Sequence, residues 1–184
     1  IDTPHPRFAR MYPRCAARAD ARGASEHRRR LVAGLSGRVI EVGAGPGANF
    51  AHYPAGVSEV VAVEPEPYLR ERSEEAATMA PVKVTVVSGL ADALPPDSES
   101  VDGGVALLVL CSVPDQARAL AELRRVIKPG GELRFYEHVI SNRESRRKFQ
   151  RFMDATIWPR MAGGCHMTRD TRGAIERAGF IVQR

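Results

Sequence analysis

A glycine-rich segment is the part of this chain best suited to hold a small ligand. It reads VIEVGAGPGANF from Val39 to Phe50, with Gly43, Gly45 and Gly47 spaced by two. Glycine permits positive φ and lets a ligand approach the backbone closely, and the N–H groups of a following helix would point at that ligand. The segment therefore predicts a nucleotide-like ligand, and a tight turn without any ligand is the weaker alternative.

Two acids near this segment narrow the choice of ligand. Glu64 lies 17 positions after Gly47 (64 − 47), where a carboxylate can accept two hydrogen bonds from a ribose diol of either NAD or an adenosyl ligand. Glu41 lies just before the glycines, where it would repel a pyrophosphate but favour a cationic amino-acid group. The pair favours an adenosyl sulfonium, and an NAD(P)-linked oxidoreductase stays as the alternative.

Two histidines and two cysteines are candidates for the chemical step. His138 ends the segment ELRFYEHV and His166 precedes a predicted helix, so each is a candidate general base or acceptor contact, with a structural role as the alternative. Cys111 is expected to be a pocket residue or a small buried hydrophobe. Cys165 beside His166 suggests a metal ligand or nucleophile, but without a second ligand pair no metal site is predicted.

The elements that would position these residues alternate between apolar strands and amphipathic helices. Such alternation predicts a mainly parallel sheet covered on both faces, with ligands beyond the carboxyl ends of the strands at the switch point. Strands are predicted at 38–42, 58–64, 82–87, 101–110 and 132–139, and a sixth begins at Phe180. Helices are predicted at 5–19 (broken near Pro13), 25–35 (capped by Ser25), 67–80 (begun by Pro67), 114–127, 141–156 and 168–180 (capped by Thr168).

Length, charge and cysteine content exclude several classes of protein. A chain of 184 residues suits one domain with a sizeable core. Its three cysteines are far apart and form no CxxC pair, so neither a zinc ribbon nor a disulfide framework is predicted. The net charge of +5 comes largely from clusters at 27–30 and 143–151, which lack interleaved base-stacking aromatics, so no nucleic-acid partner is predicted. The cysteines are expected to be free thiols in a reducing cytoplasm, and no apolar run long enough for a membrane-spanning helix is found.

Four segments together resemble a known family. EVGAGPG, AVEPEP, GLADALPPDSESVDGGVA and LAELRRVIKPGGEL are similar, in order and spacing, to the class I S-adenosylmethionine-dependent methyltransferases with a methyltransferase type 11 domain. LVLCSVPD, FYEHV, TIWPR and GGCHMTRDT resemble the narrower thiol S-methyltransferase-like branch, which neighbours the quinone-ring C-methyltransferases. The resemblance implies a Rossmann-like, doubly wound, three-layer α/β/α fold, S-adenosylmethionine as cofactor and S-adenosylhomocysteine as product.

The resemblance also implies a set of cofactor contacts. Glu64 would hold the ribose hydroxyls, and the carbonyl of Leu107 would accept from the ligand's ammonium. Relatives often have an Asp at the adenine amino group where this chain has Leu90, so Leu90 and Ala91 would contact adenine through backbone and packing. Tyr12 would close over the cofactor, and Pro65 would lie beside the adenine. The methionine end would be wrapped by Glu41, Gly43, Ala44, Gly45 and Gly47.

The predicted function is methyl transfer to a small, lipophilic acceptor, with a thiol favoured over a quinol, phenol or amine. A non-catalytic cofactor-binding protein is a further alternative. One domain would comprise a helical lead-in (1–37), a cofactor-binding core (38–140) and acceptor-side helices with the start of the last strands (141–184). Arg143–Trp158 predicts an ordinary amphipathic helix, and its basic and apolar faces make peripheral membrane contact or a lid over a lipophilic acceptor the alternative.

Overall fold

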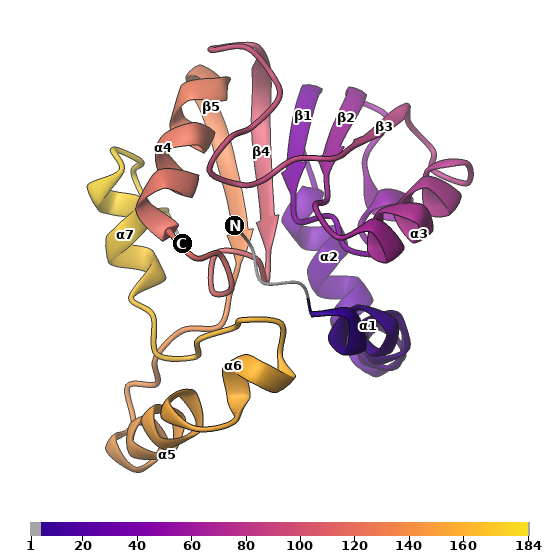
Figure 1. Cartoon of the computed structure of the whole chain (residues 1–184). Helices are drawn as coiled ribbons and strands as arrows, with labels where there is room; N and C mark the ends of the chain where they lie inside the picture. Colours follow the sequence, from indigo (N-terminus) through magenta and orange to yellow (C-terminus); the bar gives the residue numbers. More distant parts are fainter. Residues whose placement is uncertain (1–4, 184) are drawn as a thin grey trace.

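A single parallel sheet forms the centre of the molecule. The computed structural model describes residues 5–183, so the predicted domain boundaries at residues 1 and 184 lie outside the described residues. The sheet has the order β3-β2-β1-β4-β5 (Figure 1). Its strands are β1 (Gly37–Val42), β2 (Val57–Val63), β3 (Val84–Val87), β4 (Val101–Leu107) and β5 (Ile127–Tyr136). The order reverses between β1 and β4, which is the switch point of a doubly wound sheet.

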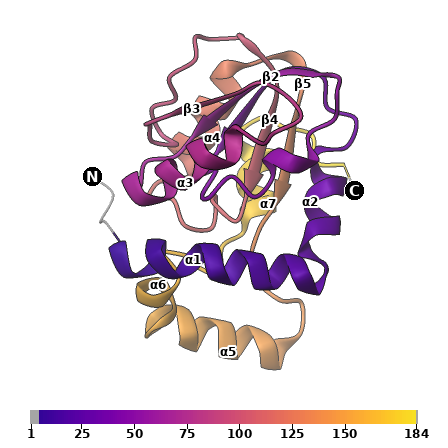
Figure 2. The same ribbon diagram turned by 90° about the vertical axis from the view of Figure 1, so that its right-hand side faces the viewer.

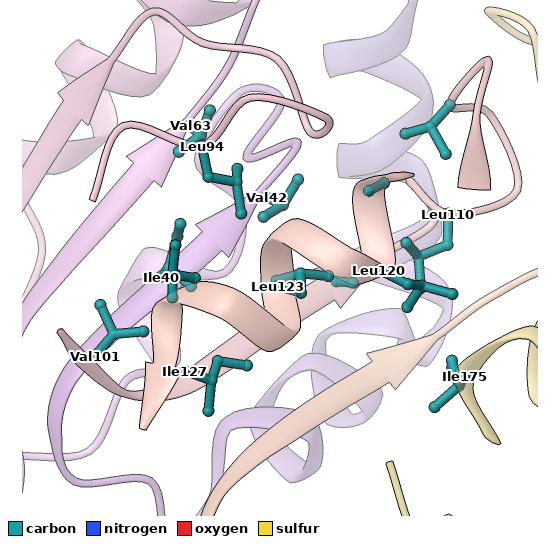
Figure 3. Packing of buried hydrophobic residues seen from close by; sticks show 14 residues of the cluster. Ile40, Val42, Val63, Leu94, Val101, Leu110, Leu120, Leu123, Ile127 and Ile175 are labelled. Carbon is teal, nitrogen blue, oxygen red and sulfur yellow. The ribbon is translucent and has the colours of Figure 1, made fainter. Parts of the chain in front are cut away.

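Helices cover both faces of the sheet, because the strand side chains alternate between two apolar layers. On one face, Ile40 and Val42 pack with α4 (Gln116–Val126) and α7 (Thr171–Arg177), as Figure 3 shows. On the other face, Val39 packs in a second cluster that includes residues of α2 (Ser25–Val32) and α3 (Pro67–Ala77). The predicted three-layer α/β/α arrangement is therefore confirmed.

The remaining helices lie beyond the carboxyl ends of the strands. They are α1 (Pro6–Ala19), α5 (Glu144–Ala155) and α6 (Trp158–Met161). Figure 2 shows α1 running across this edge of the sheet, with α5 on its far side. Two short turns, η1 (Asp20–Ala24) and η2 (Phe50–His52), complete the elements. Within residues 5–183, no helix is long and apolar enough to cross a bilayer.

Two predictions about the first helices are wrong. The helix does not break at Pro13, because a proline removes one hydrogen bond but its fixed φ is itself helical. The chain turns instead at Gly23, whose φ of 106° only glycine adopts readily. Ser25 has helical dihedrals and makes no capping hydrogen bond, since η1 leads directly into α2.

Two predictions about the end of the chain are also wrong. Asp170, rather than Thr168, caps the last helix, because its carboxylate accepts from the N–H of Gly173. No strand forms over the described residues 180–183. The N–H of Phe180 donates to the carbonyl of Ile175 in the turn that ends α7, so it is not available to a sheet ladder. The side chain of Phe180 packs against the core on the α4 face.

Candidate active site

The glycine loop follows β1 and is tied to the end of β2. The N–H of Gly43 donates to the carbonyl of Val63 at 2.8 Å. Gly43 and Gly47 have φ of 67° and 77°, and a β-carbon would come within 2.5 Å of Val109 at the first and 2.7 Å of Phe50 at the second. A side chain at either position would therefore clash with Val109 or Phe50 inside the domain, whether or not a ligand is bound. The predicted need for glycine at these positions is supported by close packing as well as by backbone conformation.

Glu64 ends β2 directly beside this loop. Its two carboxylate oxygens accept from the backbone N–H groups of Gly45 at 2.8 Å and Glu66 at 3.0 Å. Burial raises the pKa of Glu64, whose side chain is buried at the carboxyl end of β2. Each oxygen has two lone pairs and uses one, so the carboxylate retains acceptor capacity for a ribose diol. The residues present thus fit an adenosyl ligand. Pro65, next in the chain, accepts from Arg70 through its carbonyl.

Glu41 points away from the crevice, toward the α2 face of the sheet. Its oxygens accept from Asn49 Nδ2 at 2.8 Å and from the hydroxyl of Tyr53 at 2.7 Å, and burial raises its pKa to about 7. Arg28 donates in turn to Asn49 Oδ1 at 3.0 Å. This buried network joins Glu41, which precedes the glycine loop, to Asn49, which follows it, and so holds the two ends of the loop together. Contact of Glu41 with the methionine end stays a prediction.

An apolar cavity of about 200 Å³ opens beyond the ends of β4 and β5. Leu107 forms part of its wall, as do Leu108 and Tyr136, and His27 of α2 stacks on Tyr136 with ring centroids 5.5 Å apart. Leu108 has φ of 56°, a conformation that costs energy in a non-glycine residue, and its N–H donates to Tyr136. The other lining residues are Tyr12, Cys15, Ala16, Ala19, Ala24 and Arg28.

Helix α1 places Tyr12 over the glycine loop. A β-carbon on Gly45 would lie 3.2 Å from the Tyr12 ring, so the ring is in close contact with the loop. Burial raises the pKa of Tyr12, and its hydroxyl is therefore neutral at physiological pH. The ring thus packs on the glycine loop, and its closure over the cofactor stays a prediction. Helix α1 forms one wall of the cavity and covers the loop at the same time.

The two residues predicted to contact adenine lie after β3. Leu90 pairs with Ala93 in an isolated antiparallel bridge, and its side chain is 36% exposed. Ala91 packs against the core on the α4 face. Both lie in the loop that leads from β3 toward β4. Their contact with a ligand stays a prediction. Ala44, the remaining predicted contact, is buried, and its N–H donates to Val63.

Glu137 organises the chain immediately after β4. Its carboxylate accepts from the N–H groups of Val109, Leu110 and Cys111 at 2.9, 2.8 and 3.0 Å. Burial raises the pKa of Glu137 to about 8. No role is predicted for Glu137 from the sequence. The sequence signal that could have pointed to Glu137 is its position: it is an acid at the carboxyl end of a predicted strand, next to His138.

His138 faces two cysteine sulfurs. Its Nδ1 lies 3.3 Å from the Sγ of Cys165 and 3.8 Å from the Sγ of Cys111, and the two sulfurs are 3.4 Å apart. Trp158 meets the imidazole edge-on at 6.3 Å. His166 is different, because it reaches this region through its backbone N–H, which donates to the carbonyl of Cys111 at 2.8 Å. The cysteine–histidine pair that the sequence suggested, Cys165 with His166, is therefore not the one that the fold brings together.

A family model agrees with this arrangement of loop, acid and sheet. Residues 40–135, which are 96 of the 184 residues (135 − 40 + 1), match the family described as "Methyltransferase domain". The chain belongs to this methyltransferase family. The matched range includes the glycine loop, Glu64 and the strands that position both, and it ends within β5, just before Glu137 and His138.

Two relatives carry the name of a thiol methyltransferase. The chain is 40% identical over 158 residues to mouse thiol S-methyltransferase TMT1B, a match that covers 80% of this chain and 62% of that protein. It is 37% identical over 159 residues to human thiol S-methyltransferase TMT1A, again covering 80% of this chain and 62% of the relative. This methyltransferase chain thus spans less than two thirds of the length of these relatives.

Solved structures share the fold at low sequence identity. An S-adenosylmethionine-dependent methyltransferase from Thermotoga maritima has a TM-score of 0.71 and 24% identity, covering 95% of this chain and 80% of that one. A methyltransferase of the same description from Mesorhizobium loti has a TM-score of 0.63 and 23% identity, covering 88% and 83%. The class I methyltransferase fold that the sequence predicted is confirmed.

Proposed function

We propose that this methyltransferase binds S-adenosylmethionine and transfers its methyl group to the thiol of a small, lipophilic acceptor. The observation that carries the proposal is that Glu64 accepts from the N–H of Gly45 in the glycine loop, which is in close contact with Tyr12 in the wall of the apolar cavity. The names of the relatives favour a thiol over a quinol, phenol or amine. We divide the methyltransferase domain into a helical lead-in that covers the site (1–37), a core that holds the cofactor (38–140) and an acceptor-side segment (141–184).

Each part of the site has a separate task in this reaction. The cofactor supplies a methyl group that is already activated on a sulfonium. Glu64 accepts from the ribose hydroxyls, while the loop from Gly43 to Gly47 lets the ligand approach the backbone. Leu107 and Tyr136 form an apolar wall for the acceptor. Holding two reactants in line supplies about 7–11 kcal/mol of the barrier reduction, which makes alignment the main contribution of the protein.

The acceptor's proton needs little help from the protein. A free thiol has a pKa of about 8.5, so part of it is already ionised near neutral pH, and a nearby cation increases that fraction. Arg28 lines the cavity and is itself held by Asp20 at 2.8 Å, which fixes its position. A general base at His138 or His166 remains a further proposal, and it would contribute about 10²–10⁴-fold.

We also propose that α5 touches an anionic membrane surface from the cytoplasmic side. Phe149 and Phe152 are 61% and 64% exposed, and no residue of α5 is buried. An ordinary amphipathic helix would bury its apolar face against the domain. The basic residues Arg146, Lys148 and Arg151 on the same helix match the charge of an anionic bilayer. A lipophilic acceptor dissolved in that bilayer would lie beyond the same edge of the sheet as the cavity (Figure 2).

A methyl-transfer assay tests the acceptor class. The chain is incubated with methyl-labelled S-adenosylmethionine and matched panels of alkyl thiols, phenols, quinols and amines of equal hydrophobicity. We expect labelled thioether from the thiols and much slower transfer to the other panels. Transfer to phenols or amines at rates above those of the thiols would overturn the choice of acceptor.

Calorimetry tests the cofactor separately from the acceptor. We expect S-adenosylhomocysteine to bind and NADH and NADPH to give no heat, because the matched family and the fold are those of methyltransferases. Binding of NADH without binding of S-adenosylhomocysteine would favour the oxidoreductase alternative. Binding of S-adenosylhomocysteine with no transfer to any panel would favour a non-catalytic cofactor-binding protein.

A further inference from the structure

Three side chains with soft or borderline donor atoms converge from three distant parts of the chain. Cys111 follows β4, His138 follows β5 and Cys165 precedes α7. Their three donor atoms, two Sγ and one Nδ1, all lie within 4.8 Å of one another. Both cysteines are buried, and the imidazole is half-buried. The remaining cysteine, Cys15, is exposed and lies outside the cluster.

The spacing of the three donor atoms matches that of ligands around one tetrahedral metal ion. Zinc bonds of about 2.3 Å to sulfur and about 2.0–2.1 Å to nitrogen place two sulfur ligands roughly 3.8 Å apart and a sulfur and a nitrogen roughly 3.6 Å apart. The observed separations are 3.4 Å for the sulfur pair and 3.3 and 3.8 Å for the sulfur–nitrogen pairs. A shift of a few tenths of an ångström would fit a metal ion among them.

Charge balance favours a divalent ion at this position. Two thiolates and a neutral imidazole around a dication give a net charge of zero, which a buried cluster tolerates far better than an isolated thiolate. A metal ion would displace the thiol protons to solvent, because only thiolates bind it.

The surroundings of the cluster resemble an outer ligand shell. The backbone of Cys111 is fixed by Glu137, which accepts from its N–H, and by His166, which donates to its carbonyl. Trp158 packs edge-on against His138, and its Nε1 is buried without a partner among residues 5–183. Such an N–H is a donor available to a sulfur ligand. Outer partners of this kind hold first-shell ligands in orientation.

We propose that Cys111, His138 and Cys165 form a zinc site with three protein ligands and one open coordination position. Three protein ligands with an open position are typical of catalytic rather than structural zinc sites. The cluster directly follows the strand ends that line the cavity, since Leu108 and Tyr136 lie three and two residues before Cys111 and His138. The role of the open position rests on the proposed function: it would bind the sulfur of the acceptor thiol. The thiol would release its proton to solvent as the zinc–sulfur bond forms.

Metal titration of the intact chain tests the site without any activity measurement. The reduced, metal-free chain is titrated with Zn²⁺ and with Co²⁺ while protons released to a weak buffer are counted. We expect one ion per chain, proton release, and a thiolate-to-cobalt charge-transfer band with tetrahedral d–d absorption. Absence of the band, or spectra of an octahedral ion with only oxygen and nitrogen ligands, would overturn the proposal.

Matched substitutions assign the ligands. His138→Gln keeps a half-buried polar side chain and should weaken zinc affinity by more than the roughly 10–100-fold that loss of an outer-shell partner costs. Cys165→Ser should do the same, whereas Cys15→Ser should leave affinity unchanged because that thiol is exposed and is not part of the cluster. Equal zinc affinity in His138→Gln and the native chain would contradict the site. A Cys111–Cys165 disulfide found by mass spectrometry of the freshly purified chain, formed in preference to metal binding, would also contradict it.

Addition of a small alkyl thiol to the cobalt form tests the open position. We expect the charge-transfer band to intensify as a third sulfur binds, with or without S-adenosylhomocysteine. An unchanged spectrum would show that no thiol reaches the ion and would overturn the role of the open position. Zinc binding without methyl transfer to thiols would instead contradict the proposed function, so the two failures are distinguishable.

Discussion

The two halves of the sheet hold their functional side chains in different ways. In the β1–β2 half, Glu41 finds its partners Asn49 and Tyr53 only 8 and 12 residues along the chain. In the β4–β5 half, Glu137 finds its partners 26 to 28 residues away, and the two sulfurs of the cysteine pair are 54 residues apart. The first half is therefore a local motif that spacing reveals, whereas the second exists only once the strands are side by side.

This contrast predicts that the first half governs cofactor affinity and the second governs acceptor chemistry. Substitutions in one half should then leave the other property nearly unchanged. Substitutions at Glu64 and at the two histidines test that separation, and a loss of acceptor chemistry from the first half or of cofactor affinity from the second would contradict it.

The largest effect is expected from Glu64→Ala in the β1–β2 half. The substitution removes the acceptor for two ribose hydroxyls and leaves the N–H groups of Gly45 and Glu66 without their partner. Hydrogen bonds to a charged group contribute about 1.5–3 kcal/mol each, so S-adenosylhomocysteine affinity should fall by at least about 100-fold. Calorimetry measures this directly.

Glu66→Ala is the matched control for Glu64. Its side chain caps α3 by accepting from Leu69 at 2.7 Å, while the backbone N–H that Glu64 needs is retained. Cofactor affinity should therefore remain near that of the native chain. Equal affinities in all three proteins would show that Glu64 does not hold the ribose.

The second largest effect concerns the two histidines of the β4–β5 half. His138→Gln should lower kcat/KM for a thiol by about 100-fold or more, because the imidazole is the group that faces the sulfur cluster. His166→Gln should have a much smaller effect, since His166 contributes a backbone N–H that glutamine retains. Initial rates over a range of thiol concentrations separate kcat from KM. A larger loss in His166→Gln would reverse the assignment.

Stability should depend on pH through buried acids of both halves, since burial also raises the pKa of Glu137 to about 8, and the share of Glu41 in the first half can be measured separately. The pKa of Glu41 is raised to about 7 by burial, while an unfolded glutamate titrates near 4.5. Between these values the folded chain binds more protons than the unfolded chain, so the free energy of unfolding falls as pH rises toward 7. The loss is at most about 3 kcal/mol at about 1.4 kcal/mol per pKa unit.

Urea unfolding of the native chain and of Glu41→Gln at several pH values measures this slope. Glutamine keeps one acceptor oxygen and does not titrate, so we expect the variant to show a flatter dependence between pH 5 and 7. Parallel curves for the two proteins would mean that Glu41 is not the group responsible.

The smallest effect on stability is expected at α5. Replacing Phe149 and Phe152 with serine should change the free energy of unfolding by no more than about 0.5 kcal/mol per site, because both side chains are largely exposed. The same pair should strongly reduce co-sedimentation with anionic phospholipid vesicles. Met79→Ser, at a site 85% exposed on the body of the domain, is the control that should leave vesicle binding intact. Unchanged vesicle binding in the double variant would contradict membrane contact through α5.

Much of the fold could be predicted from local pattern. The first four strands and the helix begun by Pro67 lie close to their predicted places, because apolar periodicity and proline geometry act over a few residues. The errors fall where tertiary context decides. Ser25 continues a helix that begins before it, and the segment after Phe180 forms no strand in the described residues because its N–H closes a helix end.

The sequence by itself determined the cofactor side of this protein. A glycine loop and an acid 17 positions later are close in the chain, and backbone conformation alone requires glycine at those sites. Only the tertiary structure brought together the groups that we propose for the acceptor side. Cys111, His138 and Cys165 carry no spacing signal, and they meet because parallel strands bring the ends of β4 and β5 to one edge of the sheet, where the segment before α7 returns to join them.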